Sequence, residues 1–245
     1  MANMGSKGIV KYEESFAADN IGGSAADGLA WLVTGDTNDT IFARAVAAGR
    51  GLHVRAITAA TNDNMVDFAS DTLLFYGQEG HCAAEVLLQL TDVTNRAFFF
   101  GFNDDVSEDS GTLPAELSGT TFTANGATHV GIVYDTGATN DELYCHWADG
   151  GTKTTTAAAD LRMTGMAPTN SQWLWMRVEL QDRGSGNGLR ATFIAVDHNG
   201  KSIEKVFNTS VTRSTGLCYW LGVENRSAST VTIYVKQPIW EQGMA

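Results

Sequence analysis

Oxygen-bearing side chains gather in one short stretch of the chain, F-G-F-N-D-D-V-S-E-D-S-G at residues 100–111. Within seven positions it holds five acidic or amide residues, Asn103, Asp104, Asp105, Glu108 and Asp109. Such oxygens are the ligands that calcium prefers, although their spacing differs from the D-x-[DN]-x-[DN]-G pattern of an EF-hand loop. The stretch predicts either a metal site or an exposed hairpin tip whose acids keep the preceding aromatic strand soluble.

Other signatures of reactive chemistry are missing from the sequence. No two of the five histidines are two or four positions apart, so no local metal-binding pair is encoded. The chain has no G-x-S-x-G elbow and no glycine-rich phosphate loop that opens a helix. Cys82, Cys145 and Cys218 show no C-x-x-C spacing, and we expect buried thiols rather than disulfides or a zinc site. The sequence therefore predicts no cofactor and no enzyme activity.

Aromatic side chains offer a different type of site, because their faces can stack on sugar rings. The candidates are Trp147, Trp173, Trp175, Tyr219 and Trp220. On a strand, Trp173 and Trp175 would point to the same face, and we expect both to fill the core. Trp147 comes directly before the turn sequence A-D-G-G, so we expect it near the surface and select it as the candidate glycan-binding residue.

Strands joined by tight turns must position all of these residues. Alternation with period two recurs along the chain in ten or more segments, among them residues 84–90, 97–102, 173–180, 189–196 and 218–223. Turn sequences rich in Gly, Asp and Asn separate them, and only the Ala-rich pieces 43–48 and 157–161 would each accommodate a helical turn. The pattern predicts an all-β antiparallel sandwich formed by one domain over residues 1–245, with residues 1–16 as a candidate extended N-terminal arm.

The order of the last strands is similar to that of a known fold. A hairpin over residues 173–201 is followed by C-Y-W-L-G-V-E-N-R-S-A and by the closing strand V-T-I-Y-V-K-Q-P-I-W-E. Together with the upstream pair A-E-V-L-L-Q-L-T-D and R-A-F-F-F-G-F-N-D-D, this order resembles concanavalin A-like jelly rolls. The resemblance covers roughly residues 70–240 and implies a jelly-roll sandwich.

Members of that superfamily that hydrolyse β-glucans carry a strand motif of the form E-x-D-x-E, whose outer carboxylates act as nucleophile and acid. The nearest stretch here runs from Glu85 to Gln89, with Leu87 in place of the central acid. Because the Gln89 amide cannot exchange the proton that the reaction requires, the resemblance implies a chain without this activity. A glycoside hydrolase is therefore less favoured than the two non-enzymatic functions considered below.

Charge and targeting signals argue against nucleic-acid binding, membrane insertion and secretion. The net charge of −12 gives a negative surface that repels nucleic acid, and no apolar run is long enough to span a membrane. No secretory signal is visible, so we expect the protein to fold in the cytoplasm in which it is made. Jelly rolls of this kind recur as decoration or cement proteins on the heads of tailed bacteriophages, and the polar Ser/Thr/Asn/Gly-rich composition is similar to theirs.

The sequence thus favours a non-enzymatic virion protein, assembled in the host cytoplasm, that decorates and stabilises a phage capsid. Its partners would be the major capsid protein or other virion proteins, and we expect a homo-oligomer, most simply a trimer on local threefold axes. The alternative is a lectin-like carbohydrate-binding module, also compatible with a virion, that recognises a host surface glycan.

Overall fold

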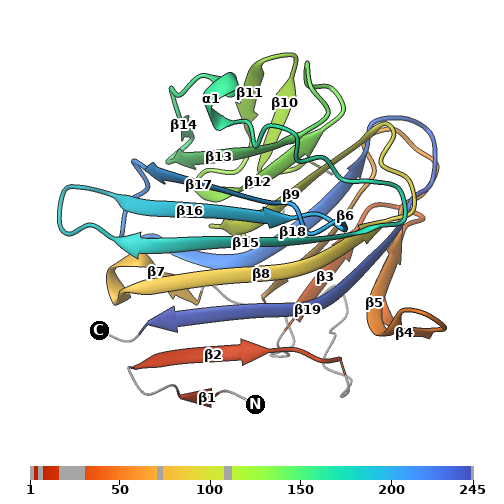
Figure 1. Ribbon diagram of the computed structural model, residues 1–245, viewed down its shortest axis with the longest axis horizontal. Coiled ribbons are helices and arrows are strands. Elements are labelled where there is room, and N and C mark those ends of the chain that lie inside the picture. The colour runs from red at the N-terminus through yellow and green to blue at the C-terminus, as the bar shows by residue number, and fades with distance from the viewer. Residues whose placement is uncertain (1–2, 5–7, 17–30, 71–73, 108–111, 244–245) are drawn as a thin grey trace.

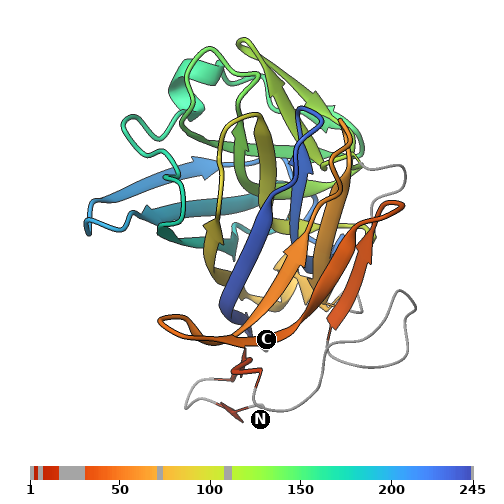
Figure 2. The same cartoon turned by 90° about the vertical axis from the view of Figure 1, so that its right-hand side faces the viewer.

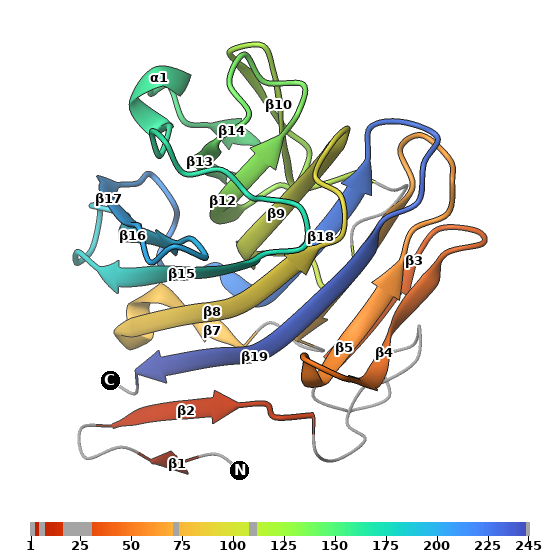
Figure 3. The ribbon, with the colours of Figure 1, turned by 45° about the vertical axis from the view of Figure 1, so that its right-hand side comes forward.

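The computed structural model describes residues 3–4, 8–16, 31–70, 74–107 and 112–243. In this part of the chain almost all regular structure is antiparallel strand, arranged in two large sheets that pack face to face (Figures 1 and 3). The predicted all-β antiparallel sandwich is confirmed.

The first sheet contains both ends of the described chain. Its nine strands are, in spatial order, β1 (Asn3–Met4), β2 (Ile9–Glu13), β19 (Thr232–Gly243), β8 (His81–Leu90), β15 (Trp173–Asp182), β16 (Leu189–Val196) and β17 (Ser202–Asn208), with β5 (Gly51–Ile57) paired to β19 and β4 (Thr40–Ala47) paired to β5. Figure 2 shows the β4–β5 hairpin beside β19 at one end of the sandwich. Part of the predicted N-terminal arm, β2, is thus a strand that pairs with β19.

The second sheet has eight strands in the described residues. They are β14 (Thr152–Lys153), β13 (Leu143–Asp149), β12 (His129–Asp135), β9 (Arg96–Asn103), β18 (Gly216–Asn225), β6 (Met65–Ser70) and β3 (Trp31–Gly35), with β7 (Phe75–Tyr76) paired to β18. A separate hairpin, β10 (Ala115–Ser118) and β11 (Thr121–Ala124), a 3-10 turn (Gly77–Glu79) and the short helix α1 (Ala158–Leu161) complete the described elements. None of the helices in the described residues has the length and apolar character needed to cross a membrane.

Local sequence explains strand β15 and the turn between β16 and β17. Burial alternates along β15, where Leu174, Met176 and their alternate neighbours are buried while the residues between them are partly exposed. The β16–β17 turn is closed by Asp197, whose side-chain Oδ1 accepts hydrogen bonds from the backbone N–H groups of Asn199 and Lys201, both at 2.9 Å. Gly200 completes this turn with φ +79, a value that glycine adopts without strain.

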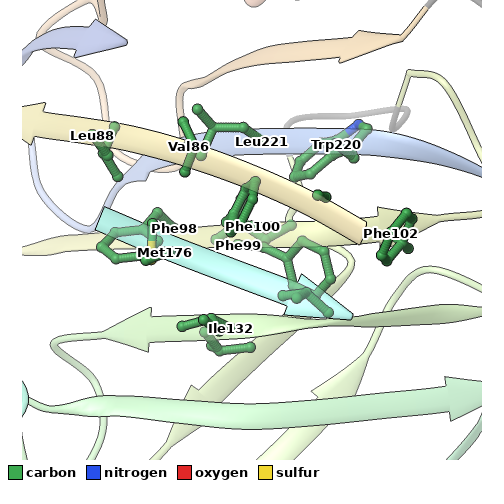
Figure 4. Packing of buried hydrophobic residues seen from close by; sticks show 14 of the residues in the cluster. Val86, Leu88, Phe98, Phe99, Phe100, Phe102, Ile132, Met176, Trp220 and Leu221 are labelled. Atoms are coloured by element: carbon green, nitrogen blue, oxygen red, sulfur yellow. The ribbon is translucent and has the colours of Figure 1, made fainter. Parts of the chain in front are cut away.

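The core lies between the two sheets. Figure 4 shows Val86 and Leu88 of β8 together with Met176 of β15 beside Phe98 and Phe100 of β9, all of them buried. Removing so much aromatic surface from water is the main stabilising contribution to a sandwich of this size.

The eight-stranded sheet is buried on its other face as well. Every residue of β9 and β12 is buried, which one covered face alone does not explain. Tyr219 donates a hydrogen bond to the Glu85 carbonyl of the nine-stranded sheet (3.3 Å), so its neighbour Trp220 points to the opposite face, where it meets Phe99. There the β10–β11 hairpin lies over β13, and the Phe122 ring stacks on the His146 ring at 4.3 Å.

Candidate functional site

The structure places Trp147, the predicted glycan-binding residue, in the interior. Its exposed fraction is 4%, and its ring lies 5.3 Å from that of Phe207 on β17. The expectation that Trp147 is near the surface is therefore wrong. The turn that follows it does reach solvent, but β17 covers the strand that carries the indole.

The oxygen-rich stretch begins inside the sandwich. Asn103 is fully buried at the end of β9, and its amide donates a hydrogen bond to the Asp105 carbonyl at 2.9 Å. The Asp104 backbone N–H donates to the Thr128 carbonyl (2.9 Å), and the Asp105 carboxylate accepts from the Ser107 N–H (3.1 Å). Two of the five predicted ligands, Glu108 and Asp109, lie outside the described residues. Among the described residues, no group of three or more His, Cys, Asp or Glu side chains is arranged to hold a metal ion.

Two histidines that are far apart in the sequence meet beneath the β10–β11 hairpin. His129 Nδ1–H donates to the Gly126 carbonyl (3.2 Å), so its Nε2 accepts the 2.9 Å hydrogen bond from His146 Nδ1–H. Burial lowers the pKa of His129 to about 4, and it lowers that of His146 well below its usual value, helped by the charges of His129 and Lys153. Both rings are fully buried, which marks this pair as part of the packing between sheet and hairpin.

All three cysteines are free and buried, as expected. Burial raises the pKa of Cys82 to about 12, and it also raises the pKa values of Cys145 and Cys218 above the usual thiol value. The thiolate is the reactive form of cysteine, so these side chains offer little nucleophilic chemistry at neutral pH.

Glu85, the one carboxylate of the altered glucanase motif, is held in an ion-pair network on the outer face of the nine-stranded sheet. Arg177 on the neighbouring strand β15 forms ion pairs with Glu85, with Glu179 (2.5 Å) and with Glu241 of β19 (3.2 Å). Burial acts to lower the pKa of Arg177, but the hydrogen bond to Glu179 and the nearby carboxylates raise it on balance. The three carboxylates therefore share one cation held between them, an arrangement that suits stability more than proton transfer.

The aromatic residues of β15 lie on that same outer face. Because Leu174 and Met176 point into the core, Trp173 and Trp175 point away from it and are partly exposed. The sequence prediction that they share a face is confirmed, and the prediction that they fill the core is wrong. In the strand register, Trp175 lies opposite Leu87 of β8, which lies opposite Lys236 of β19.

Tyr234 of β19 extends this aromatic row across the sheet. Gln89 of β8 stands between Trp173 and Tyr234 in the register, and the Lys236 ammonium lies 5.0 Å from the centroid of the Trp173 ring. We call Leu87, Trp173, Trp175 and Tyr234 the aromatic platform. All four side chains are partly exposed, and the Lys236 ammonium lies beside them.

A groove of about 330 Å³ borders this platform. Its lining includes Leu87 of β8, Lys236 of β19, Arg50 and Leu52 of the β4–β5 hairpin, and residues 15–16. Strand β5 pairs with β19 and β4 pairs with β5, and Arg50 in the turn between β4 and β5 reaches Gln89 of β8 through a hydrogen bond. Strand alternation signalled the shared face of the two indoles, but nothing in the local sequence signalled that a hairpin more than 100 residues away completes the site.

Comparisons with known proteins bear on the fold. No protein-family model matches the sequence, and no curated protein is significantly similar to it. A protein of unknown function from Shewanella oneidensis MR-1 is similar in structure, with a TM-score of 0.63, 7% identity, and coverage of 100% of this chain and 90% of that chain. The seed lectin of Lotus tetragonolobus has a TM-score of 0.57 and 8% identity, covering 96% of this chain and 100% of that chain.

A third similar structure is a marine alginate lyase from Aplysia kurodai, with a TM-score of 0.56, 8% identity, and coverage of 94% of this chain and 97% of that chain. Identities this low show the fold alone. The two packed antiparallel sheets form a sandwich with the concanavalin A-like lectin fold, as the strand order predicted.

Proposed function

We propose that this protein binds a polysaccharide on the aromatic platform without cleaving it. The observation that carries the proposal is the outward row of Trp173 and Trp175, beside Tyr234 and a groove of about 330 Å³. Aromatic faces stack on the apolar faces of sugar rings, and polar groups at their edges then bond the hydroxyls.

The spacing of the platform suits an extended ligand. Alternate residues of a strand are about 7 Å apart, so Trp173 and Trp175 offer two successive stacking surfaces along β15. Tyr234, two strands away in the same register row as Trp173, carries the Arg50 guanidinium over its ring and so adds a cation to this row. A chain of sugar rings would contact these surfaces together, whereas a single small ligand would use one.

The names of the similar structures support a carbohydrate ligand. Two are described as seed or peanut lectins, and one as an alginate lyase. The proposal of binding without turnover is supported by Glu85, because its carboxylate is paired with Arg177 and the other two motif positions on the same strand are Leu87 and Gln89.

The test measures binding of soluble neutral and acidic polysaccharides to the protein by isothermal titration calorimetry. We expect Trp173→Ala and Trp175→Ala each to weaken binding by about tenfold, as stacking contributions of 1–3 kcal/mol imply. Trp147→Phe is the matched control, since that indole is buried away from the platform, and its affinity should equal that of the wild type. Equal affinity in all three variants, or no binding to any polysaccharide of the panel, would refute the proposal.

The role of a capsid decoration protein stays a prediction, together with its capsid partners, its trimeric state and its place in a virion. None of the similar structures named above is described as a virion protein. Counting copies of this chain in gradient-purified particles by quantitative mass spectrometry tests it. Hundreds of copies per intact head would support shell decoration, and absence from particles would refute it.

A further inference from the structure

We infer that the ligand is an anionic glycan and that the groove beside the aromatic platform holds one of its carboxylates on Arg50. This inference rests on the proposed function and names the class of polysaccharide. Support for this inference comes from the set of contacts that hold Arg50 against the sheet and from the positive charges around Arg50.

Arg50 is fixed on two sides. Its Nε–H donates a 2.7 Å hydrogen bond to Gln89 Oε1, and its guanidinium carbon lies 4.2 Å from the centroid of the Tyr234 ring. Gln89 is itself held, because its Nε2–H donates to the Ser171 carbonyl at 2.6 Å and only 5% of the residue is exposed. The guanidinium plane therefore has a defined orientation before any ligand arrives.

The Nη end of this guanidinium is available to a ligand. Arg50 lines the groove, and within the described part of the chain its two Nη groups make no hydrogen bond or ion pair. A planar guanidinium with a free pair of N–H groups matches the two oxygens of a carboxylate. Because Gln89 and Tyr234 already restrain the side chain, little rotamer entropy remains to be lost when such a ligand binds.

The surroundings of Arg50 are cationic in a protein whose net charge is −12. Lys236 lines the same groove, and the exposed Arg55 lies opposite Tyr234 in the strand register. In the described residues neither forms an ion pair. Three cations thus stand around Tyr234, and a local positive potential of this kind attracts anions to an otherwise negative molecule.

Two acidic side chains near this site, Glu85 and Glu14, are engaged elsewhere. Glu85 pairs with Arg177 on the far side of Leu87, and Glu14, next in the chain to the groove edge, accepts hydrogen bonds of 2.6 Å from the Phe16 N–H and the Tyr12 hydroxyl. Neither carboxylate lines the groove. A sugar carboxylate that enters the groove would therefore approach Arg50 without meeting either of these charges.

The experiment compares the same polysaccharide with its carboxylates charged and with them blocked as methyl esters. Polygalacturonate is titrated against the full chain beside its fully methyl-esterified form, at low and physiological salt. We expect at least tenfold weaker binding of the ester, and an affinity for the acid form that falls as salt rises. Dextran sulfate beside neutral dextran distinguishes a carboxylate from any dense anion: tighter binding of dextran sulfate than of polygalacturonate would overturn the carboxylate assignment.

Variants test whether the preference for the acid form depends on Arg50. In Arg50→Gln the ratio of acid to ester affinity should fall from more than ten to near one, and Arg50→Lys, which keeps the charge but loses the fork, should give an intermediate ratio. Lys236→Gln should lower the ratio several-fold, which keeps the test available if Arg50→Gln does not fold. Arg190→Gln is the matched control, because Arg190 is exposed on the same face of the sheet in β16, and its ratio should equal that of the wild type.

The two proposals fail in different ways. Equal binding of acid and ester that still depends on Trp173 would overturn the anionic class and leave polysaccharide binding in place. Loss of the acid preference in Arg190→Gln as well as in Arg50→Gln would overturn the role of the groove and indicate attraction by the whole sheet face. Absence of binding to every polysaccharide overturns both proposals.

Discussion

The buried histidine pair makes the stability of the sandwich depend on pH. Both rings must be neutral in the fold, because a proton on His129 Nε2 would break its bond to His146, and a proton on His146 Nε2 would meet no acceptor among the described residues. The unfolded chain takes up these protons near the ordinary histidine pKa of 6.5. Stability from the pair is therefore complete above that pH and is lost as the pH falls toward the pKa of the folded state.

The pKa of His129, lowered from 6.5 to about 4, sets the size of this effect. Proton linkage gives a loss of about 2 kcal/mol between pH 8 and pH 5, and about 3 kcal/mol by pH 4, from His129 alone. His146 acts in the same direction. Burial also raises the pKa of Glu224 to about 8, which has the opposite sign, so the effect must be measured as a difference between variants.

The assay is urea unfolding followed by tryptophan fluorescence at pH 8 and pH 5 for the wild type, His129→Gln and the control His198→Gln, whose side chain is exposed in a turn. The change with pH should be about 2 kcal/mol more destabilising in the wild type and in His198→Gln than in His129→Gln. Equal changes in all three proteins would refute the reasoning. Nuclear magnetic resonance of the wild type tests it independently, because the His129 and His146 rings should remain neutral at pH 5.5; titration of these two rings near pH 6.5 would also refute it.

Two further variants test packing and charge. Gly131→Ala would place a Cβ 2.6 Å from the Phe100 carbonyl oxygen, so we expect a loss of more than about 2 kcal/mol, whereas Gly200→Ala, with open space and only its positive φ, should lose about 1 kcal/mol. Thermal denaturation measures both, and equal melting temperatures would contradict the prediction. Arg177→Gln leaves three carboxylates without their shared cation. We expect it to lower stability by about 1–2 kcal/mol at low salt and by less in 1 M NaCl. The exposed control Arg190→Gln should change stability by under about 0.5 kcal/mol. A salt-independent loss would contradict an electrostatic origin.

The sequence predicted strands well where alternation was sharp. The expected segments 173–180 and 189–196 correspond to Trp173–Asp182 and Leu189–Val196, because apolar and polar residues alternate there and a glycine-rich turn separates them. Of the two Ala-rich pieces, residues 157–161 contain the four-residue helix α1, but residues 43–47 belong to strand β4. Alanine fits either state, and pairing with β5 decided the outcome through contacts that local propensity does not describe.

Orientation of the strands was harder to predict than their location. Alternation shows that Trp173 and Trp175 share a face, yet Leu174 and Met176 on the other face are equally apolar, so the sequence does not say which pair is buried. For Trp147 the deciding contact is with Phe207, sixty residues later. The meeting of His129 with His146, and of Arg50 with Gln89, likewise depends on strand order, which hydrophobic periodicity leaves open.

The burial of the second sheet explains why the platform is the surface to test. The eight-stranded sheet is covered on one face by the core and on the other by the β10–β11 hairpin and its loops, so its aromatic residues serve packing. On the outer face of the nine-stranded sheet, nothing in the described chain covers Trp173 and Trp175 fully. The charged residues Arg177 and Glu179 lie on the same face of this strand. Isolated exposed apolar residues need no explanation, but a row of aromatic rings beside a restrained arginine does. Binding of a glycan would remove those rings from water and supply the anion that Arg50 is oriented to receive.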